Sequence, residues 1–147
     1  MQTNVQDETS YCYIKGDIIY QNPMLQIRSW LNVADNSGAK RVGMIGVPGR
    51  GRKMKASLGD VITCTVKQAM PFGQVKKGEV VWALIVRTRK ERKRHDGSYV
   101  RFDENACVIL AGKDVREPKG TRVFGPIAKE VKDKGFSKIA SLAEEIY

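Results

Sequence analysis

The sequence reads VITCTVK at residues 61–67, and this stretch alternates apolar and polar side chains. In an extended chain the alternation puts Ile62, Cys64 and Val66 on one face of a strand, with the threonines and the lysine on the other. A strand with this pattern is buried on one side only. The stretch therefore predicts a β-sheet whose inner face covers a hydrophobic core.

Two further runs, VVWALIV at 80–86 and ACVIL at 106–110, are almost continuously apolar and rich in β-branched residues. Such runs are typical of central strands that are covered on both faces. From Trp30 onward, clusters of Gly, Asp, Asn and Pro separate short apolar runs. This punctuation predicts a mainly β protein, a small five- or six-stranded β-barrel of the SH3 or OB type.

The segment between these two runs, residues 87–102, is strongly basic and contains Asp96-Gly97, a pair that favours tight turns. It predicts a basic hairpin that protrudes from the barrel. At the C-terminal end, Pro126 can open a helical segment over 127–134 that Gly135 closes. Residues 141–144 have the spacing of a capping box before a last turn. We therefore expect one or two short helices packed against the barrel.

A chain of 147 residues has the length of one domain. Residues 1–23 are polar and slightly acidic, with Lys15 against Asp7, Glu8 and Asp17. They lack the apolar core of a secretory signal and the Arg-rich character of a mitochondrial presequence. We expect 1–23 to be a poorly ordered N-terminal extension and 24–147 to be the barrel domain; a second interpretation makes Met24 the natural start.

The charge indicates a polyanionic partner. The chain has 26 Lys and Arg against 16 Asp and Glu, a net charge of +10 with a sequence pI near 9.7. Such a surface attracts phosphate backbones and releases their counterions, so affinity falls steeply with salt. A membrane surface is a weaker interpretation, because no basic amphipathic helix dominates the chain and no stretch approaches the roughly 20 apolar residues that span a bilayer.

The cations concentrate in three segments that the strand pattern places in loops, around residues 50–55, 76–77 and 87–101. One such run alone would most often be a solvated face. Three on one small domain favour a nucleic-acid surface over a solvated face. Charge alone does not say which nucleic acid is bound, but a rigid cationic surface suits A-form RNA, which is recognised mainly through backbone, shape and 2′-hydroxyl contacts. The candidate RNA-binding residues are Arg50, Arg52, Lys53, Lys55, Lys76, Lys77, Arg89, Lys90, Arg92, Lys93, Arg94 and Arg101.

The sequence offers no pattern for a metal, a cofactor or a disulfide framework. The cysteines Cys12, Cys64 and Cys107 are odd in number and form no C-x-x-C pair, which indicates a reducing compartment. Cys64 and Cys107 lie in strand-like runs, where a thiol usually acts as a small buried hydrophobe. The glycine-rich segment 49–52 lacks the G-K-[ST] of a P-loop.

An enzyme is not predicted. His95 is the only histidine and lies in a cationic turn. Four aspartates, Asp35, Asp60, Asp96 and Asp103, occupy turn-like contexts where their side chains usually bond local backbone amides. We find no convincing set of nucleophile, base and orienting residue.

Several ordered blocks resemble one known family. LNVADNSGA at 31–39, GDVI at 59–62, VKKG at 75–78, the spaced signature from Ala83 to Ile109, and GTRVFGP at 120–126 are similar to large ribosomal subunit protein fourteen in its bacterial and organellar form. The resemblance covers Met24 to Tyr147. The sequence differs from the family at Lys55, where an aromatic residue is usual, and at Glu144, where a proline is usual.

The resemblance implies a five-stranded barrel with a protruding hairpin and short C-terminal helices. It also implies a structural component of the large ribosomal subunit that binds large-subunit rRNA and contacts small-subunit rRNA at an intersubunit bridge. The implied protein neighbours are large-subunit proteins three and nineteen and the ribosome silencing factor, whose docking face includes Thr121 and Arg122. The implied location is the ribosome of a bacterial cytoplasm, with an organellar ribosome as the alternative.

Two other classes remain open from the residues alone. A free-standing OB-type binder of single-stranded RNA needs exposed aromatic side chains for stacking, and only Tyr99 and Phe102 lie near the basic hairpin. A small hydrolase using Asp35 or Asp103 would require turnover that disappears when one carboxylate is replaced.

Overall fold

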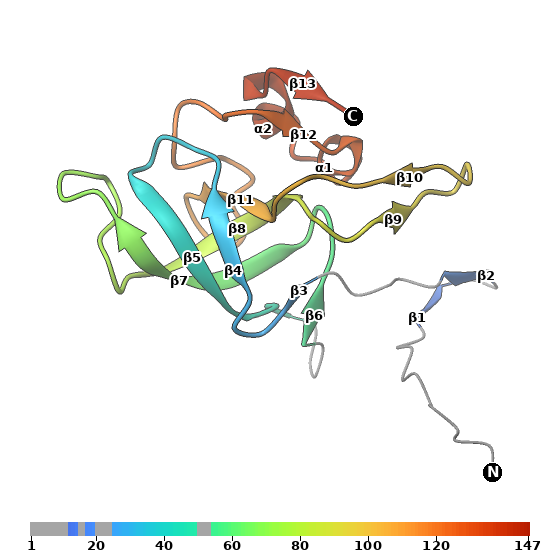
Figure 1. Ribbon diagram of the computed structural model, residues 1–147, viewed down its shortest axis with the longest axis horizontal. Helices are drawn as coiled ribbons and strands as arrows, with labels where there is room; N and C mark the ends of the chain where they lie inside the picture. Colours follow the sequence, from blue (N-terminus) through green and yellow to red (C-terminus); the bar gives the residue numbers. More distant parts are fainter. Residues whose placement is uncertain (1–11, 15–16, 20–24, 50–53) are drawn as a thin grey trace, which may run out of the picture.

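The chain forms a closed five-stranded β-barrel in a computed structural model that describes residues 12–14, 17–19, 25–49 and 54–147 (Figure 1). The barrel strands are β4 (Trp30–Val33), β5 (Ala39–Gly46), β7 (Val61–Ala69), β8 (Val80–Arg87) and β11 (Ala106–Leu110). Around the barrel they follow the order β11-β4-β5-β7-β8, and β8 closes it by pairing with β11. Within the barrel, β11 and β4 pair in parallel, and the other neighbouring strands are antiparallel. The predicted mainly β barrel is confirmed.

Short paired strands lie outside the barrel. β3 (Leu25–Gln26) pairs with β6 (Lys55–Ala56), β9 (Arg92–Lys93) with β10 (Tyr99–Val100), and β12 (Pro126–Ile127) with β13 (Glu145–Ile146). In the predicted N-terminal extension, β1 (Cys12–Ile14) pairs with β2 (Asp17–Ile19). The rest of residues 1–23 lies outside the described residues, so the predicted domain division stays a prediction.

The barrel wall separates two hydrophobic cores. Ile62, Cys64 and Val66 of β7 point into the barrel and are at most 1% exposed, which confirms the predicted alternation. β8 is buried on both faces, since Ile85 faces the barrel interior and Leu84 packs in a second core beneath the C-terminal helices. The second core explains why residues 81–86 are apolar on both faces of the strand.

Both C-terminal helices begin at residues other than the predicted ones. α1 (Lys129–Asp133) begins after Pro126 and Ile127, because these two residues are held extended by β13. α2 (Ser137–Leu142) contains Ser141 in its last turn, so the predicted capping box over 141–144 is wrong. The Ser141 hydroxyl instead donates to the Lys138 carbonyl. Within the described ranges, no helix is long and apolar enough to span a membrane.

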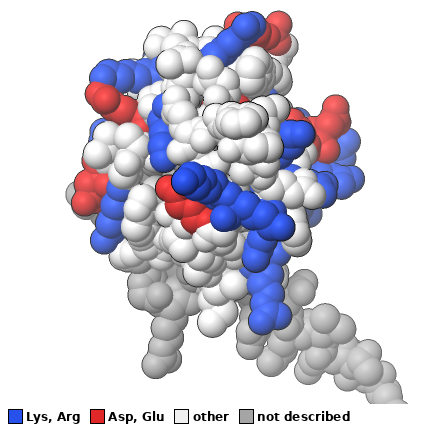
Figure 2. All heavy atoms as spheres, turned by 90° about the vertical axis from the view of Figure 1, so that its left-hand side faces the viewer, with Lys and Arg blue, Asp and Glu red and all other residues white. Residues whose placement is uncertain are grey.

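Three loops meet at one end of the barrel, the left side of Figure 1. Hydrogen bonds join the 34–38 loop to the 70–79 loop (Met70 N–H to Gly38 O, 2.8 Å) and to the 111–125 loop (Asn36 Nδ2 to Thr121 Oγ1, 2.8 Å). Figure 2 faces this end, and Lys and Arg make up most of its charged surface. The hairpin of β9 and β10 projects on the other side of the molecule.

Candidate nucleic-acid interface

The basic hairpin, residues 87–102, carries exposed cations on a defined turn. Arg94 N–H donates to Ser98 O at 2.8 Å, and Gly97 has a φ of 84°, which confirms the turn predicted from Asp96-Gly97. The Asp96 carboxylate accepts from the backbone N–H and the hydroxyl of Ser98, so it has the predicted structural role. Hydrogen bonds from Ser98 lower the pKa of the Asp96 carboxyl, which keeps this turn contact ionised.

The outward cations of the hairpin are Arg89, Lys93 and Arg101, all exposed. Among described residues, none of these three forms an ion pair with a carboxylate. Lys90 is also exposed, but its ammonium lies 2.7 Å from the Glu91 carboxylate. Arg89, Lys93 and Arg101 are therefore the hairpin side chains that remain available for phosphates.

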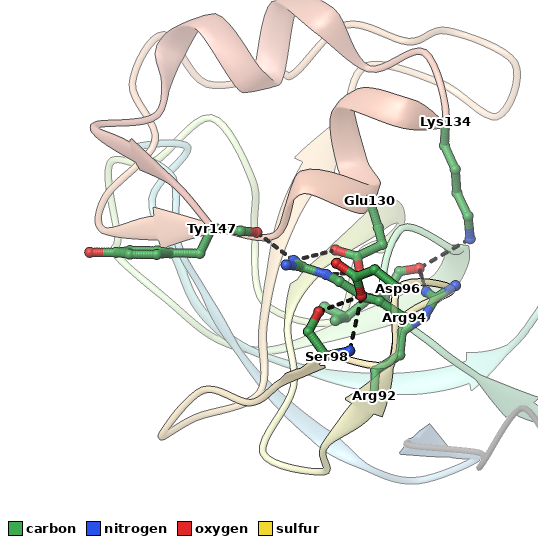
Figure 3. Close-up of polar contacts among 8 residues, drawn as sticks. Arg92, Arg94, Asp96, Ser98, Glu130, Lys134 and Tyr147 are labelled. Carbon is green, nitrogen blue, oxygen red and sulfur yellow. Dashed lines mark hydrogen bonds and ion pairs between the residues drawn. The ribbon is translucent and has the colours of Figure 1, made fainter.

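Arg94 instead fastens the hairpin to the C-terminal segment (Figure 3). Its guanidinium makes two hydrogen bonds to the Glu130 carboxylate, at 2.8 and 3.2 Å, and one to the main-chain oxygen of Tyr147 at 2.7 Å. Burial opposes ionisation of Glu130, but the hydrogen bond and charge of Arg94 outweigh it and lower the pKa of the carboxyl. We call Arg94, Glu130 and Tyr147 the hairpin latch.

Arg92 makes a second attachment at the base of the hairpin, where Nη1 donates to the Leu58 carbonyl at 2.9 Å. Lys134 from the end of α1 reaches the same turn, bonding Leu58 O at 3.0 Å and the Asp60 carboxylate at 2.8 Å. Asp60 is buried and also accepts from the backbone N–H of Ser57, as expected for a structural aspartate. Two of the predicted rRNA-binding arginines, Arg92 and Arg94, thus hold the hairpin in place.

The remaining predicted cations occupy other parts of the surface. Arg50, Arg52 and Lys53 lie outside the described residues. Lys55 lies in β6 and is half-buried. Lys76 and Lys77 are exposed in the 70–79 loop, on the side of the barrel away from the hairpin. The described cations of the hairpin and of the 70–79 loop therefore do not form one continuous face.

Thr121 and Arg122 are exposed and held by Asn36. The Asn36 carboxamide donates to Thr121 Oγ1 and accepts from the backbone N–H groups of Thr121 and Arg122, at 2.8 and 3.2 Å. Arg122 also lies 5.3 Å from the centroid of the Phe124 ring. In the sequence, Asn36 stands out only as a member of the block at 31–39 that resembles the family. Nothing in that block indicates that Asn36 bonds a residue 85 positions later in the chain.

Comparison with known proteins settles the family. The family model for ribosomal protein L14p/L23e matches residues 24–147. The chain belongs to this family. It is 60% identical over 123 residues to large ribosomal subunit protein uL14 of Aquifex aeolicus, covering 84% of the chain and 99% of the relative, and 59% identical over 123 residues to the same protein of Aquifex pyrophilus, with the same coverage.

L14p/L23e membership makes the chain a protein of the large ribosomal subunit, located on the ribosome, in a family that is not enzymatic. The acidic residues agree with a structural role. Asp35 is buried and accepts from the backbone N–H of Ser37 and, across the barrel end, from that of Ile109 at 2.7 Å. Asp103 is exposed, and its predicted turn role stays a prediction.

The thiols of the L14p/L23e barrel are buried as predicted. Cys64 and Cys107 are fully enclosed, and burial raises the pKa of Cys64 to about 12 and that of Cys107 well above its ordinary value. Both thiols therefore stay protonated at neutral pH. Within the described residues, no group of three or more metal-ligating side chains comes together.

Proposed function

We propose that the protein binds large-subunit rRNA directly, with the basic hairpin as its main phosphate-binding element. The observation that carries this proposal is the contrast within the hairpin. Arg92 and Arg94 make internal contacts that fix the hairpin, whereas Arg89, Lys93 and Arg101 are exposed and form no ion pair with any carboxylate in the described part of the chain. Holding the cations in place before RNA binds lowers the ordering cost of association.

The separation of the basic segments supports contact with RNA on more than one side. The hairpin lies on one side of the barrel, and the 70–79 loop, which carries Lys76 and Lys77, lies on the other (Figure 1). A protein of this shape can lie between two RNA surfaces. We therefore propose that it also contributes to an intersubunit bridge with small-subunit rRNA, as the family resemblance implies.

Protein partners are proposed from the same resemblance. We propose large-subunit proteins three and nineteen as neighbours, and the ribosome silencing factor as a ligand of Thr121 and Arg122. The exposure of these two residues and their fixation by Asn36 support a docking role.

The salt dependence of binding to the host's purified large-subunit rRNA tests the main proposal. We expect the triple variant R89A/K93A/R101A to bind more weakly and to shallow the slope of log K against log salt by about 0.7 to 0.9 per lost contact. The control K113A/K129A/K132A removes three exposed lysines that belong neither to the basic hairpin nor to the 70–79 loop. The proposal fails if both variants change the slope equally, or if neither changes it.

A further inference from the structure

The 70–79 loop presents an aromatic side chain entirely to solvent. Phe72 has a relative exposure of 102%, the largest among the exposed hydrophobic residues described, and Met70 beside it is 53% exposed. Single exposed hydrophobic residues are common, but a phenyl ring with no protein contact gains nothing from folding. The full exposure of Phe72 therefore favours a binding partner for this ring outside the chain.

The loop that carries Phe72 is firmly held. The Met70 N–H donates to Gly38 O at 2.8 Å, and the Gln74 N–H donates to Ser37 O at 2.9 Å. Gly38 and Gly73 touch backbone to backbone, so that a Cβ on Gly38 would lie 2.5 Å from the Gly73 Cα. Because both flanks of Phe72 are bonded to the barrel, the backbone that carries the ring is held in place.

The charges of this loop favour a nucleic acid over an apolar protein surface. Lys76 and Lys77 are exposed and, within the described ranges, form no ion pair. The acid of the loop, Glu79, accepts from the Lys76 N–H at 3.1 Å and lies 3.8 Å from the Lys119 ammonium. Lys and Arg surround this end of the barrel in Figure 2. An aromatic ring with neighbouring cations is the combination that binds unpaired nucleotides, by stacking on the base and contacting the phosphates.

We propose that Phe72 stacks on an unpaired base of ribosomal RNA, while Lys76 and Lys77 contact the phosphates beside it. This second RNA contact rests on the proposed function and adds a different chemistry on the opposite side of the barrel. The proposed contact of the hairpin is with phosphates, whereas the 70–79 loop adds stacking through Phe72, which does not depend on counterion release.

Four variants separate stacking from other roles in the same rRNA binding assay. F72A should weaken binding about 5- to 150-fold, the range for loss of one stacked base, and leave the salt slope unchanged. F72W should bind as well as wild type, and F72L as poorly as F72A, because leucine keeps apolar bulk without a π-face. K76A/K77A should shallow the salt slope by up to about 1.4 to 1.8.

Two results would overturn the proposal: F72A could bind rRNA normally, or F72L could bind as well as wild type. If F72A binds free rRNA normally and yet fails to sediment with the large subunit, the partner of Phe72 is a protein. The control I27A removes another exposed apolar side chain and should have no effect. R89A/K93A/R101A distinguishes the two proposals: if it loses affinity while F72A does not, only the stacking proposal fails.

Discussion

Replacing Glu130 with glutamine should loosen the basic hairpin from the C-terminal segment. The substitution keeps the size of the side chain and removes the charge that faces Arg94. The side chains of Arg94 and Glu130 are 25% and 12% exposed, so the pair is neither a surface salt bridge nor a fully buried one. Exposed pairs contribute about 0 to 1 kcal/mol, and breaking buried ones costs about 3 to 5 kcal/mol.

For the hairpin latch we therefore expect E130Q to lower the free energy of unfolding by about 1 to 3 kcal/mol at pH 7, measured by urea denaturation. The matched control is E117Q. Glu117 pairs with Lys138, but their side chains are 55% and 64% exposed. Solvent screens that pair, so E117Q should change stability by less than about 0.5 kcal/mol.

The effect of E130Q should also depend on pH. The pKa of the Glu130 carboxyl lies below its ordinary value of 4.5 in the folded chain. A carboxyl with a lowered folded pKa stabilises the fold above the unfolded pKa, and this contribution is lost as the pH falls through the folded value. The difference between wild type and E130Q should therefore be largest above about pH 5 and shrink at more acidic pH.

A double-mutant cycle with R94Q isolates the pair from its surroundings. If the reasoning holds, the two substitutions are not additive, and the coupling energy is about 1 kcal/mol or more. The reasoning is refuted if E130Q costs no more than E117Q, or if its cost is the same at pH 7 and in acid.

Two further predictions concern the barrel itself. N36A removes hydrogen bonds to Thr121 and Arg122, so it should destabilise the fold by about 1 to 2 kcal/mol in urea and weaken binding of purified ribosome silencing factor, whereas unchanged binding would show that Asn36 does not position this face. Cys64 and Cys107 should resist alkylation by iodoacetamide at pH 8 until urea unfolds the barrel, and modification at the rate of a free thiol would contradict their burial and raised pKa values.

The strands were predictable because their pattern is local. The alternation at 61–67 needs only the geometry of an extended chain, and the turn at Asp96-Gly97 needs only two residues. The helix starts were not predictable in this way. Pro126 is a good first residue for a helix, but it pairs with Glu145 of β13, 19 residues later in the chain. This pairing holds Pro126 extended.

In the candidate site too, local patterns were predictable from the sequence and long-range contacts were not. Sequence reasoning found the basic hairpin from its charge density, yet it could not distinguish Arg94 from Lys93. The distinction depends on Glu130, which lies 36 residues away and meets the hairpin only when α1 packs on the barrel. Phe72 was missed because a single aromatic residue in a loop gives no sign of its exposure before the fold is known.

The central claim is that the unpaired cations of the basic hairpin contact rRNA phosphates. A density map of the host's large ribosomal subunit tests it most directly, through the distances from the side-chain nitrogens of Arg89, Lys93 and Arg101 to the nearest phosphate oxygens. We predict distances of about 2.7 to 3.2 Å for these residues, with Arg94 still bound to Glu130. Hairpin cations that face solvent or another protein, with no phosphate in reach, would contradict the claim.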